Sequence, residues 1–240
     1  MNIQIFICFH KIFFPNIYEI SSIENEKYLT FYGVKDKYST MNEKIIYECE
    51  LPYYNPIIQQ KKYNEGSCIY HIYKNNLYNK YDYIGFCQYD MIFLNSFFKN
   101  IEHKVLNNTN TIFYLDFFKL AFFGGQTTII KNYHNINAGL NSYNNFFNKN
   151  YTTENLISNK MIICNTFLIP KNMYEKMMSW LIYYFKDDID ERYICEDNNN
   201  FNPGHMIEAL TSMFLSLEIS EGAEYEKLNL IHDHNLKIKK

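Results

Sequence analysis

The chain lacks paired cysteines, an excess of basic residues and long apolar runs, and each absence excludes a class of protein. Its six cysteines are widely scattered and none forms a C-x-x-C pair, so we expect reduced, mostly buried thiols and no zinc site. The formal net charge of −3 argues against a general nucleic-acid binder. No segment offers the roughly 20 apolar residues that cross a membrane. These absences predict an intracellular protein.

The N-terminal 14 residues are apolar enough to resemble a signal peptide, but they lack a basic beginning and contain His10 and Lys11. We therefore expect a soluble, cytoplasmic protein. Alanine, glycine and arginine are scarce, whereas Asn, Ile, Lys and Tyr are abundant, a bias typical of an AT-rich genome. With 47% hydrophobic and 18% aromatic residues the chain cannot be disordered, and Tyr and Phe must supply much of its core.

Apolar segments of strand length and helix length alternate along the chain, which predicts a single α/β domain over residues 1–240. Helical spacing is found at 67–75, 127–147, 173–185 and 206–217, and strand-like runs are found at 3–9, 28–34, 83–87, 111–115 and 161–169. There is no internal repeat and no linker. We expect a largely parallel central sheet flanked by helices.

Three polar positions follow predicted strands directly. His10 and Lys11 follow the first strand, Asp90 follows the strand at 83–87, and Asp116 follows the strand at 111–115. Ligands bind at the carboxyl edge of open α/β sheets, so His10 and Lys11 could contact a nucleotide, and Asp90 could reach a metal or a phosphate. The alternative for Asp90 is that it only begins a turn.

Two strings and several shorter pieces carry a family resemblance. Y-N-E-G-S-C-I-Y-H-I-Y-K-N at 63–75 and Y-I-G-F-C-Q-Y-D at 83–90 resemble bacterial capsular and exopolysaccharide glycosyltransferases of the GT-A superfamily. Further pieces agree in order along nearly the whole chain: His10-Lys11, Tyr133-His134, Asn165-Thr166-Phe167 and Gly204 to Glu208.

The resemblance implies a single GT-A-like, Rossmann-like domain with a mixed, mostly parallel sheet. Residues 1–120 would form the donor half and residues 121–240 the acceptor half. It further implies a hexosyl- or related transferase that moves a sugar from a nucleotide-sugar donor, UDP-linked by analogy, to a glycan or glycolipid acceptor in surface polysaccharide or capsule synthesis. Nucleic acid is not an expected partner, and peripheral membrane association remains open.

The chain departs from the superfamily at the D-x-D motif, whose carboxylates hold a divalent cation. The matching triplet is Gln88-Tyr89-Asp90, so only the last carboxylate is present. Mn²⁺ or Mg²⁺ can be held by one or two protein ligands together with donor phosphates and water. The resemblance suggests His232 or His234 as the compensating ligand, because several members complete their site with a late histidine. The alternative is that both belong to a polar tail.

The resemblance also assigns the remaining site residues. Glu65, Tyr89 and His205 would contact the donor, and Glu196-Asp197 matches the acidic acceptor-side motif of inverting enzymes, in which a general base deprotonates the acceptor hydroxyl. Glu208 matches a family glutamate on the last helix. The structural alternatives are a solvated acidic loop for Glu196-Asp197, helix N-terminal stabilisation for Glu208, and a surface histidine for His205. A non-catalytic carbohydrate-binding or nucleotide-sugar-binding relative, kept after loss of D-x-D, is the second functional hypothesis.

Overall fold

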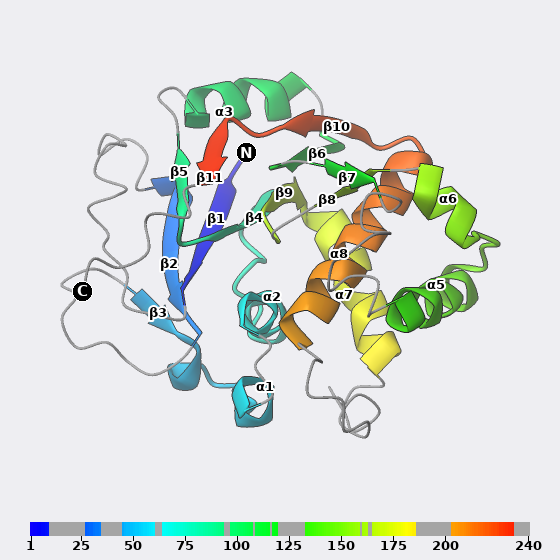
Figure 1. Cartoon of the computed structure of the whole chain (residues 1–240). Coiled ribbons are helices and arrows are strands. Elements are labelled where there is room, and N and C mark those ends of the chain that lie inside the picture. Colours follow the sequence, from blue (N-terminus) through cyan, green and yellow to red (C-terminus); the bar gives the residue numbers. More distant parts are fainter. Residues whose placement is uncertain are drawn as a thin grey trace.

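A seven-stranded sheet runs through the molecule (Figure 1). The computed structural model describes residues 1–9, 27–34, 45–60, 64–93, 97–107, 109–115, 117–119, 133–158, 160–162, 165–185 and 203–232. In spatial order the strands of the sheet are β10 (Glu224–Lys227), β6 (Thr111–Tyr114), β9 (Phe167–Pro170), β4 (Tyr83–Gln88), β1 (Ile3–Phe9), β2 (Leu29–Gly33) and β3 (Ile45–Tyr47).

Strand direction makes the sheet mixed but mostly parallel. Of the described strands in this sheet, β9 alone is antiparallel to its neighbours β4 and β6, while the remaining pairs are parallel. The carboxyl ends of β1, β4 and β6 therefore meet at one edge of the sheet. This confirms the predicted fold class. His10 and Asp116, the polar residues expected after β1 and β6, lie outside the described residues.

Two short ladders lie beside the main sheet. β5 (Met91–Phe93) pairs antiparallel with β11 (Leu230–His232), and β7 (Phe117–Lys119) pairs antiparallel with β8 (Lys160–Ile162). The first ladder directly continues β4, because only Tyr89 and Asp90 separate Gln88 from Met91. It brings the end of the described chain to the carboxyl edge of the sheet.

Helices cover both faces of the sheet. The main helices on one face are α2 (Glu65–Lys74), α7 (Lys171–Phe185) and α8 (Pro203–Ser220), with α5 (Tyr133–Phe147) packed outside them; α3 (Phe97–Asn107) covers the other face (Figure 1). Three short helices complete the described part: η3 (Glu48–Glu50), α1 (Pro56–Gln60) and α6 (Thr153–Ser158). Among the described helices, none is both long and apolar enough to cross a membrane.

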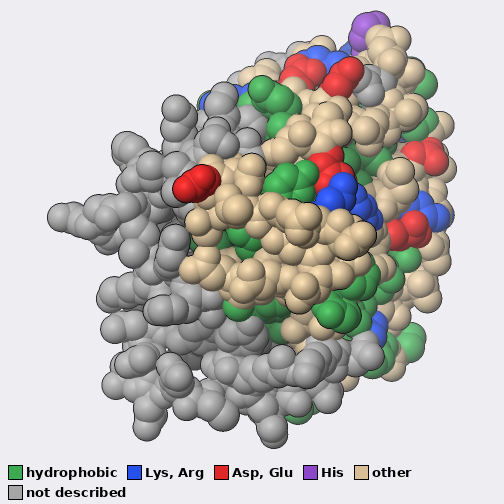
Figure 2. All heavy atoms as spheres, turned by 90° about the vertical axis from the view of Figure 1, so that its right-hand side faces the viewer, with side chains coloured by type: hydrophobic (Ala, Val, Ile, Leu, Met, Phe, Trp, Pro, Cys, Tyr) green, Lys and Arg blue, Asp and Glu red, His purple; other side chains and the backbone are tan. Residues whose placement is uncertain are grey.

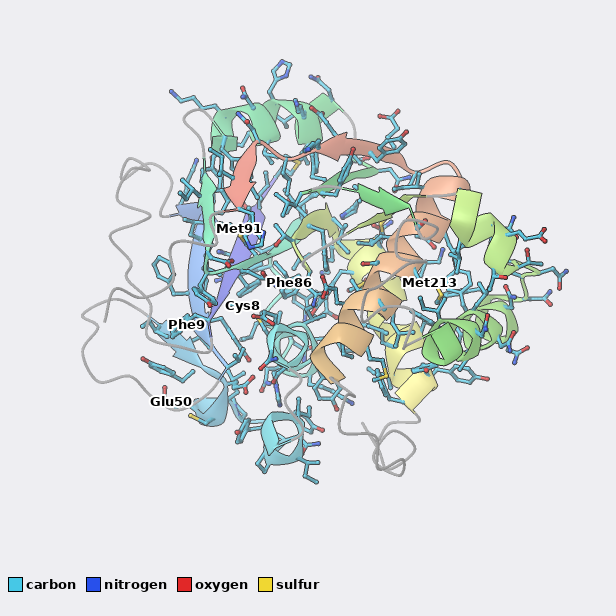
Figure 3. The ribbon with its side chains drawn as sticks, viewed as in Figure 1. Cys8, Phe9, Glu50, Phe86, Met91 and Met213 are labelled. Carbon is cyan, nitrogen blue, oxygen red and sulfur yellow. The ribbon has the colours of Figure 1, made fainter. Side chains whose placement is uncertain are left out.

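The core is divided into two layers by the sheet. Cys8 of β1 and Phe86 of β4 lie on the side that faces α2, in the cluster that also contains Met213 of α8 (Figure 3). Phe9 and Met91 belong to the second cluster, beneath α3.

Every residue of β1 is buried, and so are the first five residues of β4. Both strands are therefore almost entirely apolar rather than alternating. The exception within β1 is Gln4, whose buried amide donates to the Tyr28 carbonyl at 2.9 Å.

The predicted elements are mostly found, with two corrections. The run at 161–169 is not one strand: β8 ends at Ile162 and β9 begins at Phe167, with Asn165 at a positive φ of 43° between them. Asn tolerates this left-handed conformation, which interrupts an extended strand. The helix expected at 127–147 begins at Tyr133, and residues 120–132 lie outside the described part.

An ionic network ties the outer helices together. Lys176 of α7 donates to both carboxylate oxygens of Glu218 on α8, at 2.6 and 2.8 Å, and the Tyr143 hydroxyl of α5 donates to Glu218 at 3.0 Å. On the face formed by α5 to α8, acidic and basic side chains lie in small mixed groups among uncharged polar atoms (Figure 2). The described side chains on this face therefore form no large group of one charge sign.

A close contact joins the first turn of α2 to the second turn of α8. A Cβ atom at Gly66 would stand 2.9–3.0 Å from side-chain carbons of Ile207, closer than carbon atoms pack. Only glycine therefore allows α8 to approach α2 at this point. The contact matters for function because Glu65 precedes Gly66 and Glu208 follows Ile207.

We predict that Gly66→Ala lowers the free energy of unfolding by about 1–3 kcal/mol, the usual cost of overpacking a core, even though alanine favours helix by up to about 1 kcal/mol. Urea denaturation measures the change. Ile207→Ala removes Cγ1 and Cγ2, two of the three carbon atoms that the new methyl group meets, so the Gly66→Ala cost should shrink in that background. An equal cost in both backgrounds would contradict the proposed contact.

Candidate functional site

The centre of the candidate site is the turn that Tyr89 and Asp90 form between β4 and β5. The burial of β4 continues through Cys87, Gln88 is half-buried, and Asp90 is the first carboxylate after the strand. Met91 is again fully buried, on the α3 side of the sheet (Figure 3). The turn is thus held between two buried segments at the carboxyl edge, where α/β folds bind ligands.

His232 is brought to Asp90 by the β5–β11 ladder, in which His232 lies opposite Met91. Its Nε2 lies 3.1 Å from Asp90 Oδ2, in a hydrogen bond that the imidazole N–H donates, and the two side chains are only 20% and 17% exposed. The extended segment is therefore the correct alternative for residues 230–232, in place of a disordered tail. His234 lies outside the described residues.

The second oxygen of Asp90 is in an unusual position. Oδ1 is buried and has no hydrogen-bond partner among the described residues. A buried acceptor without a partner costs about 1–3 kcal/mol, so native proteins rarely keep one unless a ligand, ion or water satisfies it. In addition to its place in the turn, Asp90 therefore presents a carboxylate oxygen that can accept a hydrogen bond from a ligand or bind a cation.

Asp90 and Glu65 both lie close enough to Tyr89 to affect its pKa. Burial raises the pKa of the Tyr89 hydroxyl, and the negative charges of Asp90 and Glu65 raise it further. The Tyr89 phenol therefore stays protonated at neutral pH and can donate a hydrogen bond. Glu65 is the first residue of α2. Burial is the main cause that raises the pKa of the Cys8 thiol near the end of β1, and the negative charge of Glu65 raises it further. The structure thus gathers Glu65, Tyr89, Asp90 and His232 at one edge.

A buried polar cluster fixes α2, and with it Glu65. The Ser67 hydroxyl donates to Glu48 Oε2 at 2.6 Å, and His71 Nδ1 lies 3.3 Å from the same oxygen. His71 Nε2 accepts the backbone N–H of Asn55 at 3.1 Å, so Nδ1 must carry the ring hydrogen. Although it combines Ser, His and Glu, the cluster cannot supply a general base, because Nε2 is occupied and all three side chains are fully buried. Its role is to anchor α2.

Glu208 lies on α8 beyond the first turn, which contains no acidic residue. Helix-dipole stabilisation falls off within the first turn, so this position gives little support to a purely helix-stabilising role. The Gly66–Ile207 contact places the turn bearing Glu208 beside the start of α2. Glu208 is half-buried there.

Several expected site residues lie outside the described part of the chain, and their placement stays a prediction. These are His10, Lys11, Glu196, Asp197 and His234, together with the side chain of His205. Among the residues that are described, no group of three or more His, Cys, Asp or Glu side chains is arranged to hold a metal ion. Asp90 and His232 are thus a pair of candidate ligands.

One residue at this edge was given no role by the sequence. Asn165 precedes β9 and is 6% exposed, and its Oδ1 has no partner among the described residues. The only signal in the sequence was its place in the Asn165-Thr166-Phe167 string.

The comparisons with known proteins identify the fold. No protein-family model matches the chain, and no curated protein sequence matches it. The apo structure of the bifunctional glycosyltransferase WbbM superimposes with a TM-score of 0.63 over 98% of this chain, at 14% sequence identity. The chain spans only 46% of that protein.

A second match is weaker. The X-ray structure of the mannosyltransferase Ktr4p from S. cerevisiae matches with a TM-score of 0.39 and 12% identity, covering 90% of this chain and 65% of that one. This score adds nothing to the argument. The likeness to WbbM shows that the seven-stranded α/β fold of this chain matches that of a glycosyltransferase structure.

Proposed function

We propose that the protein is a GT-A-type glycosyltransferase that moves a sugar from a nucleotide-sugar donor to a glycan or glycolipid acceptor during surface polysaccharide synthesis. The observation that carries the proposal is the Asp90–His232 pair at the carboxyl edge, with Asp90 Oδ1 buried and unpartnered among the described residues. The match of the fold to a glycosyltransferase structure supports the reaction class.

The Asp90–His232 pair could hold a divalent cation if His232 released the Nε2 hydrogen that it donates to Asp90 Oδ2. Carboxylate oxygens and imidazole nitrogens are both ligands that Mn²⁺ can take, and a carboxylate oxygen is also a ligand that Mg²⁺ prefers. Asp90 Oδ2 and His232 Nε2 lie 3.1 Å apart. Mg²⁺ or Mn²⁺ bound there would take its other ligands from donor phosphates and water. The ion would neutralise the charge that develops on the diphosphate as the sugar leaves.

The chain's own residues would position the donor around this pair. The protonated Tyr89 hydroxyl can donate to a phosphate or a sugar oxygen. Glu65 begins α2, and Glu208 lies on the second turn of α8, which packs against the start of α2. Their carboxylates can accept hydrogen bonds from hydroxyl groups. The acceptor hydroxyl needs a base as it attacks the anomeric carbon. Asp197 is our first candidate for that base, ahead of Glu196 and Glu208.

A non-catalytic binding protein is the second candidate function. It is favoured by Gln88 in place of the first D-x-D carboxylate, and by the absence of any three-ligand group among the described residues. Incubation with a panel of nucleotide sugars separates the two functions, because a transferase slowly hydrolyses its donor without acceptor. A binding protein would show affinity without turnover.

We predict that Asp90→Ala abolishes the Mn²⁺-enhanced binding of a nucleoside diphosphate and leaves the fold intact, because a carboxylate past a strand end contributes little to stability. Calorimetric titration of UDP and GDP, with and without Mn²⁺, measures the effect. Asp82→Ala is the matched control: Asp82 precedes the same strand at its other end, and its carboxylate accepts from the Asn2 backbone.

His232→Ala should reduce the same Mn²⁺ enhancement, and His103→Ala, on the exposed surface of α3, should not. If Asp90→Ala and His232→Ala both keep the wild-type Mn²⁺ enhancement of nucleotide binding, the hydrogen bond between Asp90 and His232 only closes the turn. Loss of secondary structure in Asp90→Ala would instead assign a structural role to the residue.

A second experiment identifies the base. Asp197→Asn is expected to lower the transfer rate by ~10² to 10⁴ with little change in donor affinity, the usual result of removing a general base. Glu196→Gln and Glu208→Gln are measured beside it, with transfer rate and donor dissociation constant as the two readouts. If Asp197→Asn transfers sugar at the wild-type rate, the assignment is wrong. Wild-type rates in all three would favour a retaining mechanism or the binding function.

A further inference from the structure

Asn165 occupies the middle of the carboxyl edge of the sheet. β9 pairs with β4 and β6 at once, and Phe167 lies opposite Phe86 on one side and Tyr114 on the other. The Thr166 carbonyl accepts the backbone N–H of Leu115 at 3.2 Å, so the chain remains tied to β6 one residue earlier. Asn165 comes next. It therefore lies between the ends of β4 and β6, level with the end of β4 from which the Asp90 turn departs.

The side chain of Asn165 is buried without a visible reason in the fold. The residue is 6% exposed and its Oδ1 has no partner among the described residues. Seven buried side-chain atoms in the described part lack partners. Five of these carry a hydrogen, namely four hydroxyls and the Trp180 ring nitrogen, whereas the other two are the Oδ1 atoms of Asp90 and Asn165. The two oxygens that can only accept hydrogen bonds are thus both found at this edge.

The backbone supports the same interpretation. Asn165 has a φ of 43°, a conformation that asparagine tolerates and glycine adopts at no cost. Glycine would provide this turn without burying an amide that lacks a partner. Burying the Asn165 amide therefore costs free energy that the turn itself does not require. A ligand that donates a hydrogen bond to Oδ1 would offset this cost.

The hydrogen-bonding chemistry of the Asn165 amide indicates which kind of ligand group it can bind. Asn both accepts and donates, and a sugar hydroxyl does the same, so a hydroxyl matches the amide in either orientation. Phosphate oxygens at neutral pH mainly accept, so they would leave Oδ1 unsatisfied. Resting on the proposed transferase function, we propose that Asn165 binds a hydroxyl group of the donor sugar and helps to select which sugar is transferred.

The test compares nucleotide sugars with the nucleotides that lack the sugar. UDP-glucose, UDP-galactose, UDP-N-acetylglucosamine and GDP-mannose are titrated beside UDP and GDP into wild-type protein and Asn165→Gly. Asn165→Gly keeps the backbone conformation and deletes only the amide. Asn76→Gly is the matched control, because Asn76 also has a positive φ, 55°, but is exposed in the turn after α2.

We expect Asn165→Gly to weaken binding of the preferred nucleotide sugar on the order of tenfold, the effect of one lost hydrogen bond, with diphosphate binding unchanged. Asn76→Gly should change neither. The unfolding midpoint of Asn165→Gly should equal or exceed that of the wild type, because the variant removes a buried group that has no partner.

Three outcomes would overturn the inference while leaving the transferase intact: unchanged binding of nucleotide sugar, equal weakening of nucleotide sugar and diphosphate, or weaker binding of Mn²⁺ alone, which would make Asn165 a metal ligand. If the wild-type protein binds neither the nucleotides nor the nucleotide sugars, the proposed function itself is wrong, and the inference fails with it.

Discussion

The pairing of β4 with β1 on one side and β9 on the other is the constraint from which the site follows. It places β4 at the centre of the sheet with both faces buried, so its side chains must be apolar until the strand leaves the sheet. Asp90 is the first carboxylate beyond that point. Because β9 runs in the opposite direction, its beginning meets the end of β4, and Asn165 is carried to the same edge.

The helices refine what the sheet positions. Glu48, Ser67 and His71 form a fully buried polar cluster that holds α2, and Gly66 lets α8 pack directly against it. Rigid anchoring of this kind is useful at a binding site, since a ligand gains most from groups that need no rearrangement. Burying this polar cluster in the core costs free energy, but the cluster holds in place the helices that carry Glu65 and Glu208.

The sequence could predict those features that depend on local patterns. The buried run at 83–87 predicted both a strand and the position of Asp90, and the long helices at 173–185 and 206–217 were found almost as expected. The break at Asn165 was missed because apolar residues flank Asn165-Thr166 on both sides, so the whole segment resembles one strand. β10 and β11 were missed because they are short, partly exposed, and defined by partners more than 100 residues away. For the same reason, periodicity could not decide between a strand and a tail for His232.

The β5–β11 ladder affects when the site can form during synthesis of the chain on the ribosome. Asp90 and His232 are 142 residues apart in the chain. A ribosome adds about 5–20 residues per second, so Asp90 emerges roughly 7 to 30 s before the histidine that completes its surroundings. During the first part of that interval, until residue 170 has been added, β9 is also missing from its place between β4 and β6. A nascent chain therefore has no finished site, and competence to bind a ligand would arise in one late step rather than grow with chain length.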